Sequence, residues 1–153
     1  MKVEIPGKGE LEIKTVVLDL NGTIVVRGQL VEGVKERVDT IKQKGLRVVL
    51  FSGDTRGNAE MLAGELDIEF IRAGTAEEKG AEISKLDSET CAAIGNGLID
   101  VAKLGLAKLA IVTLQAEGIH TKALLAADVV VPSINDALDL LIDENSLIAT
   151  LRS

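Results

Sequence analysis

Short apolar runs alternate with segments of helical spacing along most of the chain, and this alternation restricts the fold more than any other feature. Strands are expected at 16–20, 46–51, 68–71, 91–94, 107–114 and 129–131. Helices are expected at 33–44, from a cap at Asp54 through Leu66, and from Thr75 to about Leu86. A short helix that ends at Leu104 is expected after the fourth strand, and two more helices are expected at 122–126 and 134–142. Such alternation over short connections predicts a mostly parallel sheet with helices on both faces. We therefore expect one α/β domain over residues 1–153, which begins with a β-hairpin of two short strands at 2–5 and 10–14.

The composition excludes several functional classes. A hydrophobic content of 46% is typical of a folded domain, while a net charge of −7, two Phe and no Trp or Tyr argue against a nucleic-acid partner. Cys91 is the single cysteine, so no internal disulfide can form. The N-terminus lacks the apolar core of a signal peptide, and charged residues interrupt every apolar run before it could span a membrane. A cytoplasmic protein without a membrane partner is expected.

Asp19 interrupts the first buried run, which ends at the turn-forming pair Asn21-Gly22. Ligands bind at the carboxyl ends of the strands in open α/β sheets, so Asp19 is placed where a nucleophile or metal ligand would be useful. Ser52-Gly53-Asp54 ends the second strand, and the loop 95–100 follows the fourth. Lys79 lies in the first turn of a helix that opens on a Thr75–Glu78 capping box, where the helix dipole disfavours a cation. A solvated Lys79 paired with Glu78 or Glu82 is the simpler alternative.

This ordered set of motifs resembles the haloacid dehalogenase superfamily, which includes the phosphorylation domains of P-type ATPases. The stretch 19–23, Asp-Leu-Asn-Gly-Thr, stands at the family's Asp-x-Asp-Gly-Thr or Asp-Lys-Thr-Gly-Thr signature, and Ser52 at its Ser or Thr after the second strand. Lys79 and the loop Gly-Asn-Gly-Leu-Ile-Asp at 95–100, similar to the Gly-Asp-Gly-x-Asn-Asp of P-type ATPases, complete the set. The resemblance implies a three-layer, Rossmann-like sheet without a cap domain, since 24–30 leaves room only for a small flap.

The resemblance also implies a Mg²⁺-dependent phosphohydrolase or phosphotransferase that works through an aspartyl phosphate on Asp19. Lys79 and Ser52 would hold phosphate oxygens, with further donors near Gly22, Thr23 and Gly53. The implied magnesium ligands are Asp19, Asn21, Asn96 and Asp100.

Two positions depart from the family pattern. Asn21 stands where the hydrolases usually have a general acid and base, and its amide cannot carry a proton, so turnover is expected to be slow. Asn96 stands where the family commonly has a metal-binding Asp, which removes one negative charge from the metal site. A non-catalytic regulatory protein that keeps the site to bind phosphate or a partner is therefore the alternative function, and a receiver-type signalling domain is a more distant one.

The absence of a lid predicts an open site. Such a site suits a phosphoprotein, or a phosphorylated small molecule enclosed by a neighbouring subunit of a homo-oligomer through the flap 24–30. His120, the single histidine, is expected to be a solvated loop residue, and Cys91 a core residue.

Overall fold

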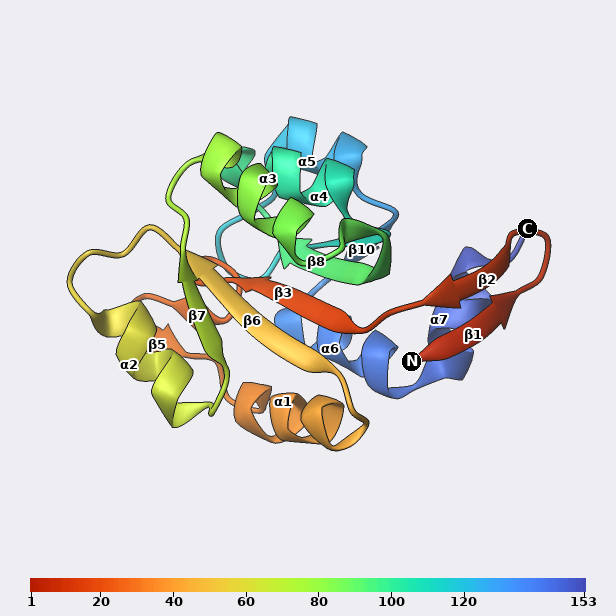
Figure 1. The fold of residues 1–153 in the computed structure, drawn as a ribbon, viewed down its shortest axis with the longest axis horizontal. Helices are drawn as coiled ribbons and strands as arrows, with labels where there is room; N and C mark the ends of the chain where they lie inside the picture. The colour runs from red at the N-terminus through yellow and green to blue at the C-terminus, as the bar shows by residue number, and fades with distance from the viewer.

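The computed structural model describes all 153 residues, and a parallel sheet forms its centre (Figure 1). The sheet has six strands in the order β10-β9-β8-β3-β6-β7. Their bounds are β3 Thr15–Asp19, β6 Arg47–Ser52, β7 Glu69–Arg72, β8 Cys91–Gly95, β9 Leu109–Thr113 and β10 Val129–Val131. Every neighbouring pair is parallel, which confirms the predicted α/β class. Because β6 and β8 flank β3 on opposite sides, the strand order reverses next to the residue that ends β3, Asp19.

Helices cover both faces of the sheet, as the sequence predicts (Figure 1). One layer holds α1 Val34–Gln43, α2 Asn58–Glu65, α6 Ile134–Ile142 and α7 Glu144–Leu151. The other holds α3 Ala76–Lys85, α4 Val101–Leu106 and α5 Thr121–Ala126, with short 3₁₀ turns η1 Ser88–Thr90 and η2 Leu98–Asp100. Side chains of the central strand alternate between the layers, so Val16 and Leu18 pack in the first and Val17 in the second. The alternation buries both faces in aliphatic side chains.

Two antiparallel hairpins flank the main sheet. The N-terminal hairpin pairs β1 Lys2–Ile5 with β2 Gly9–Glu12, and its buried Val3 and Ile5 join the core layer that contains α7. The flap pairs β4 Val25–Val26 with β5 Gln29–Leu30 directly after the Asp19 turn, as predicted. No cap domain is inserted after β3 or between β6 and α3, since the flap, α2 and β7 fill those segments.

Two expected details are wrong, and one helix is not predicted from the sequence. The second hairpin strand is Gly9–Glu12 rather than 10–14. Helix α2 begins at Asn58, behind a Gly57 with positive φ, because residues 54–57 form a turn. Asp54 still accepts hydrogen bonds from the Arg56 and Ala59 amides, so it satisfies a first-turn donor from outside the helix. Helix α7 was not predicted; it packs against β1, a contact between the two ends of the chain.

Candidate active site

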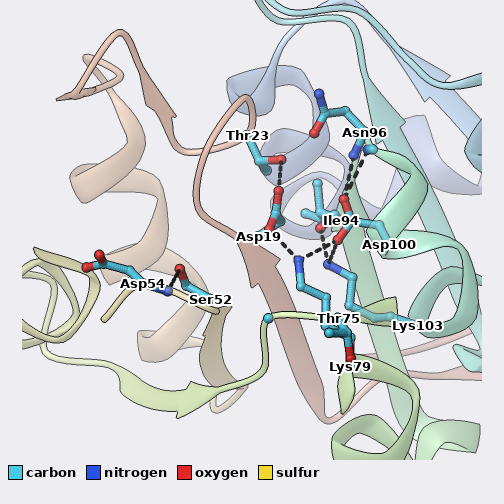
Figure 2. Close-up of polar contacts among 12 residues, drawn as sticks. Asp19, Thr23, Ser52, Asp54, Thr75, Lys79, Ile94, Asn96, Asp100 and Lys103 are labelled. Atoms are coloured by element: carbon cyan, nitrogen blue, oxygen red, sulfur yellow. Dashed lines mark hydrogen bonds and ion pairs between the residues drawn. The ribbon is translucent and has the colours of Figure 1, made fainter. Parts of the chain in front are cut away.

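Four charged side chains, Asp19, Lys79, Asp100 and Lys103, form a buried ion-pair cluster beside the switch in strand order (Figure 2). Asp19 ends β3, and Asp100 lies in η2, after β8. Lys79 points from the first turn of α3 between the two carboxylates, with Nζ 2.6 Å from Asp19 Oδ1 and 2.9 Å from Asp100 Oδ1. The solvated alternative for Lys79 is wrong, since its side chain is fully buried. Glu78 instead completes the predicted capping box with Thr75.

Lys103 is the member of the cluster that the sequence does not predict. Its Nζ lies 3.0 Å from Asp100 Oδ1 and donates a hydrogen bond of 2.9 Å to the Ile94 carbonyl, at the end of β8. The side chain is fully buried. The available sequence signal is its position one helical turn after Asp100, within a short apolar helix, which is also compatible with an ordinary surface lysine.

Both carboxylate oxygens of Asp100 have partners within the protein. Its Oδ1 contacts both lysines, and its Oδ2 accepts hydrogen bonds of 3.1 Å from the Asn96 and Gly97 amides. The side chain has no solvent exposure. The expectation that Asp100 binds magnesium stays a prediction. The residue fixes the position of Lys79 and of the loop after β8.

The charges in the cluster shift one another's pKa. Burial raises the pKa of Asp19, and the nearby Asp100 carboxylate raises it further, against the opposing effect of the lysines. Burial alone would raise the pKa of Asp100, but Lys103, Lys79 and the backbone amides outweigh it and hold that pKa below its usual value. Burial opposes the charge on Lys79, yet Asp19 and Asp100 together raise its pKa. Lys79 therefore stays cationic beside a carboxylate with a raised pKa.

Thr23 and the glycines of the two strand ends shape the surroundings of Asp19. The buried Thr23 hydroxyl lies 3.4 Å from Asp19 Oδ2, the oxygen that Lys79 does not contact (Figure 2). Gly22 has a φ of 75°, and a Cβ there would meet the Glu117 and Asn96 side chains. Gly53 lies against Gly74 so closely that a Cβ on it would overlap the Gly74 backbone. These glycines allow the backbone to come close around the carboxylate.

A cavity of about 320 Å³ opens above Asp19. Its lining includes the expected site residues Asn21, Ser52, Gly53 and Lys79, together with Leu20, Asp54, Gly74 and Ile99. The Ser52 hydroxyl accepts a hydrogen bond of 3.1 Å from the Asp54 amide, which leaves its own proton available to a ligand. The cavity thus brings together a carboxylate, a cation, a hydroxyl and glycine backbone at the ends of β3 and β6.

The oxygens available to a metal are few. No group of three or more His, Cys, Asp or Glu side chains is arranged to hold one. Asn96 is buried, and its Nδ2 donates to the Gly118 carbonyl at 2.9 Å, while its Oδ1 accepts no hydrogen bond. Asp19 Oδ2 has only the long Thr23 contact. The Asp19 carboxylate oxygen and the Asn96 amide oxygen are hard donors of the kind that suits Mg²⁺, and the other oxygen of the Asp19 carboxylate is paired with Lys79.

The remaining singled-out residues have structural roles. His120 is exposed and caps α5, since its Nδ1 accepts a hydrogen bond from the Lys122 amide. Its backbone amide donates to the Asn96 carbonyl at 2.9 Å, which ties the β9–α5 connection to the site loop. Cys91 is buried, as predicted, and burial raises the pKa of its thiol to about 11. No helix has the length and apolar character needed to cross a membrane.

The chain is similar to proteins of named function. It is 29% identical over 144 residues to a soluble P-type ATPase-like phosphatase from Methanocaldococcus jannaschii, covering 91% of this chain and 53% of that relative. It is 32% identical over 111 residues to a probable copper-exporting P-type ATPase from Archaeoglobus fulgidus, covering 68% of this chain but only 14% of the transporter. This chain therefore spans about half of the first relative and a small part of the second. No family model matches the sequence.

Solved structures agree in fold. A HAD family hydrolase from Streptomyces avermitilis superposes with a TM-score of 0.69 at 18% identity, over 85% of this chain and 83% of that one. A 3-deoxy-D-manno-octulosonate 8-phosphate phosphatase from Moraxella catarrhalis, in complex with magnesium, phosphate and KDO, superposes with a TM-score of 0.70 at 19% identity, over 92% and 94%. At these identities the structures establish the fold alone. The sequence relatives, with this fold and no inserted cap, show that the chain belongs to the haloacid dehalogenase superfamily, as a capless member similar to the phosphorylation domains of P-type ATPases.

Proposed function

We propose that this protein is a phosphohydrolase or phosphotransferase that forms an aspartyl phosphate on Asp19. The observation that carries the proposal is the contact between Asp19, at the end of the central strand, and the buried Lys79 ammonium at 2.6 Å. A carboxylate attacks an anionic phosphate only if nearby positive charge offsets the repulsion between them. Lys79 supplies that charge at the edge of a cavity large enough for a phosphate group.

The proposed reaction has two steps. Asp19 Oδ2, the oxygen not bonded to Lys79, attacks phosphorus, and the bond from phosphorus to the leaving oxygen breaks with its electron pair on that oxygen. Lys79 and the Ser52 hydroxyl donate hydrogen bonds to the phosphate oxygens. Water then attacks phosphorus, which releases phosphate and restores the Asp19 carboxylate. The leaving oxygen needs a proton in the first step, and the attacking water must lose one in the second. Apart from the nucleophile, Asp54 is the one acid that lines the cavity, and its carboxylate already accepts backbone hydrogen bonds. Both proton transfers are therefore left largely to solvent.

Magnesium fits the free oxygens of this site. Asp19 and Asn96 would hold it, with Asn21 adjacent, and the bound cation would offset charge on the phosphate. The M. catarrhalis phosphatase binds magnesium and phosphate in the same fold, which supports the assignment. One carboxylate, already paired with Lys79 through its other oxygen, favours weak binding of the ion. The M. jannaschii relative is named a phosphatase, which supports a hydrolytic activity here.

A regulatory phosphate-binding protein is the second candidate, and Asn21 is the observation that favours it. The exposed Asn21 amide lines the cavity beside Asp19 and cannot carry a proton. A protein that binds phosphate or forms the acyl phosphate without releasing it would act as a binder or a switch.

A panel of phosphorylated metabolites and acetyl phosphate, assayed with Mg²⁺ for phosphate release, tests the enzyme proposal. We expect slow turnover in the wild type and none in Asp19→Asn. A wild type that binds phosphate tightly but turns over no member of the panel would favour the regulatory function. Turnover that survives in Asp19→Asn would contradict the proposed nucleophile.

A further inference from the structure

A second hollow opens beside the Asp19 cavity, between the flap and helix α2, which lie next to each other (Figure 1). Its volume is about 530 Å³, within the range of pockets that hold small organic ligands. Leu20, Asn21 and Asp54 line both this hollow and the Asp19 cavity. A molecule whose phosphate lies at Asp19 therefore has room to place its organic group along Asn21 in this space.

Five of the eleven residues that line the hollow are apolar, and Asn58 and Glu65 lie among its polar ones. Leu20 and Val25 come from the Asp19 turn and the flap, Leu30 from β5, and Met61 and Leu62 from one turn of α2. Met61 is 62% exposed, although Ala59 and Ala63 of the same helix are buried. An exposed methionine at the edge of an apolar hollow is available for contact with a ligand.

The polar groups on the rim restrict the kind of ligand. Arg56 lines the hollow, and its guanidinium makes no ion pair and no hydrogen bond within the protein. The adjacent Asp54 carboxylate accepts hydrogen bonds from the Arg56 and Ala59 amides, so it does not neutralise the guanidinium through a direct contact. A free guanidinium and a thioether beside aliphatic side chains are the groups that pack favourably on an aromatic ring.

We propose that this hollow is the subsite for the organic group of the substrate, and that this group is aromatic, so the substrate class is small phosphate esters with an aryl or heteroaryl ring. The inference rests on the proposed function, because it uses Asp19 and Lys79 as the phosphate end of the same site. It adds Met61, Arg56 and Leu62 as residues that select the substrate and take no part in the phosphoryl transfer.

Binding of three phosphonates, with methyl, phenyl and 1-naphthyl groups, separates this inference from the proposed function. Phosphonates keep the phosphate-like head group and are not hydrolysed, so calorimetric titration in Mg²⁺ measures affinity alone. We expect 1-naphthylphosphonate to bind at least about tenfold more tightly than methylphosphonate, with the phenyl compound between them. Met61→Gln and Arg56→Gln should each reduce this preference about threefold or more. Leu125→Gln, at a leucine 85% exposed on α5, is the control and should keep it.

Equal affinities for the three phosphonates, or a preference unchanged in both Met61→Gln and Arg56→Gln, would overturn the subsite while leaving the phosphate site intact. No binding of any phosphonate by a folded wild type would contradict the phosphate site as well. A preference reduced equally by Leu125→Gln would also contradict the inference, because the effect would not be specific to the hollow.

Discussion

Lys79 Nζ lies 2.6 Å from Asp19 Oδ1 and 2.9 Å from Asp100 Oδ1, so one buried ammonium joins the end of β3 to the loop after β8. The second buried ammonium, Lys103, balances the charge of the cluster, which contains two carboxylates and two lysines. With its charges balanced, the cluster adds no net negative charge for a divalent cation, which the Asp19 and Asn96 oxygens would bind weakly. It does offer a phosphate the positive charge of Lys79.

The raised pKa of Asp19 gives a direct prediction. Burial and the adjacent Asp100 carboxylate stabilise the protonated form, so acidification should protonate Asp19 at a higher pH than the value of about 3.9 for a free aspartate. The ionised nucleophile is then lost, as pH falls, before an ordinary Asp would titrate. A pH titration of ¹³C-labelled carboxyl groups by NMR measures this midpoint, with Asp19→Asn to assign the signal. A midpoint at or below that of free aspartate would contradict the described electrostatics.

The second prediction concerns Lys103. Lys103→Met removes one charge partner from Asp100 and the donor to the Ile94 carbonyl, while Lys79 and two amides still bind Asp100. We expect the free energy of unfolding to fall by about 2 kcal/mol, measured by urea denaturation. Lys108→Met is the matched control, because its Nζ lies 3.8 Å from Glu89 at the surface, and it should cost less than about 0.5 kcal/mol. Equal losses in the two variants would show that burial of Lys103 has no energetic consequence.

Much of the site follows from the sequence because its residues sit at strand ends. Asp19 and Ser52 end apolar runs, and the carboxyl ends of parallel strands share one edge of a sheet, so their convergence needs only the fold class. Lys103 could not be found in this way. A lysine in a short helix is normally solvated, and its burial depends on the position of α4 against β8 and Asp100, which are contacts formed only in the folded chain.

The details of the fold that were not predicted have similar causes. An Asp at a helix cap and an Asp in a turn have the same local sequence pattern, so the sequence predicts that α2 begins at Asp54, several residues before its true start at Asn58. Helix α7 buries only Leu147 completely, and its contact with β1 joins the two ends of the chain. Local periodicity carries little information about such an element.

The third prediction concerns the metal. Asn96→Asp adds a carboxylate against Gly22, in the turn that follows Asp19, and should tighten Mg²⁺ binding, whereas Asp19→Asn should weaken it. Calorimetric titration of Mg²⁺ compares these with the wild type. Asn145→Asp, which adds the same charge on α7, is the control for a general electrostatic effect. An equal gain in affinity in Asn145→Asp and Asn96→Asp would argue against a metal site at Asn96.

The fourth prediction concerns Asn21. Asn21→Asp places a proton-transfer group at the cavity and should accelerate hydrolysis about tenfold or more, most for alkyl phosphates with poor leaving groups. Asn21-Gly22 and Asn96-Gly97 are both prone to deamidation, so peptide mass spectrometry must first confirm that the assayed wild type keeps its amides. If a wild type with intact Asn21 hydrolyses alkyl phosphates as fast as the variant, another residue supplies the proton.

Covalent trapping at Asp19 tests the central claim most directly. The protein is incubated with acetyl phosphate and Mg²⁺, quenched and reduced with borohydride, which converts an aspartyl phosphate to a stable alcohol that peptide mass spectrometry locates. We predict the reduced product at position 19 in the wild type and none in Asp19→Asn, because Asp19 is the carboxylate at the cavity that faces Lys79. A product at another carboxylate, or phosphate release without any trapped product at Asp19, would contradict the account.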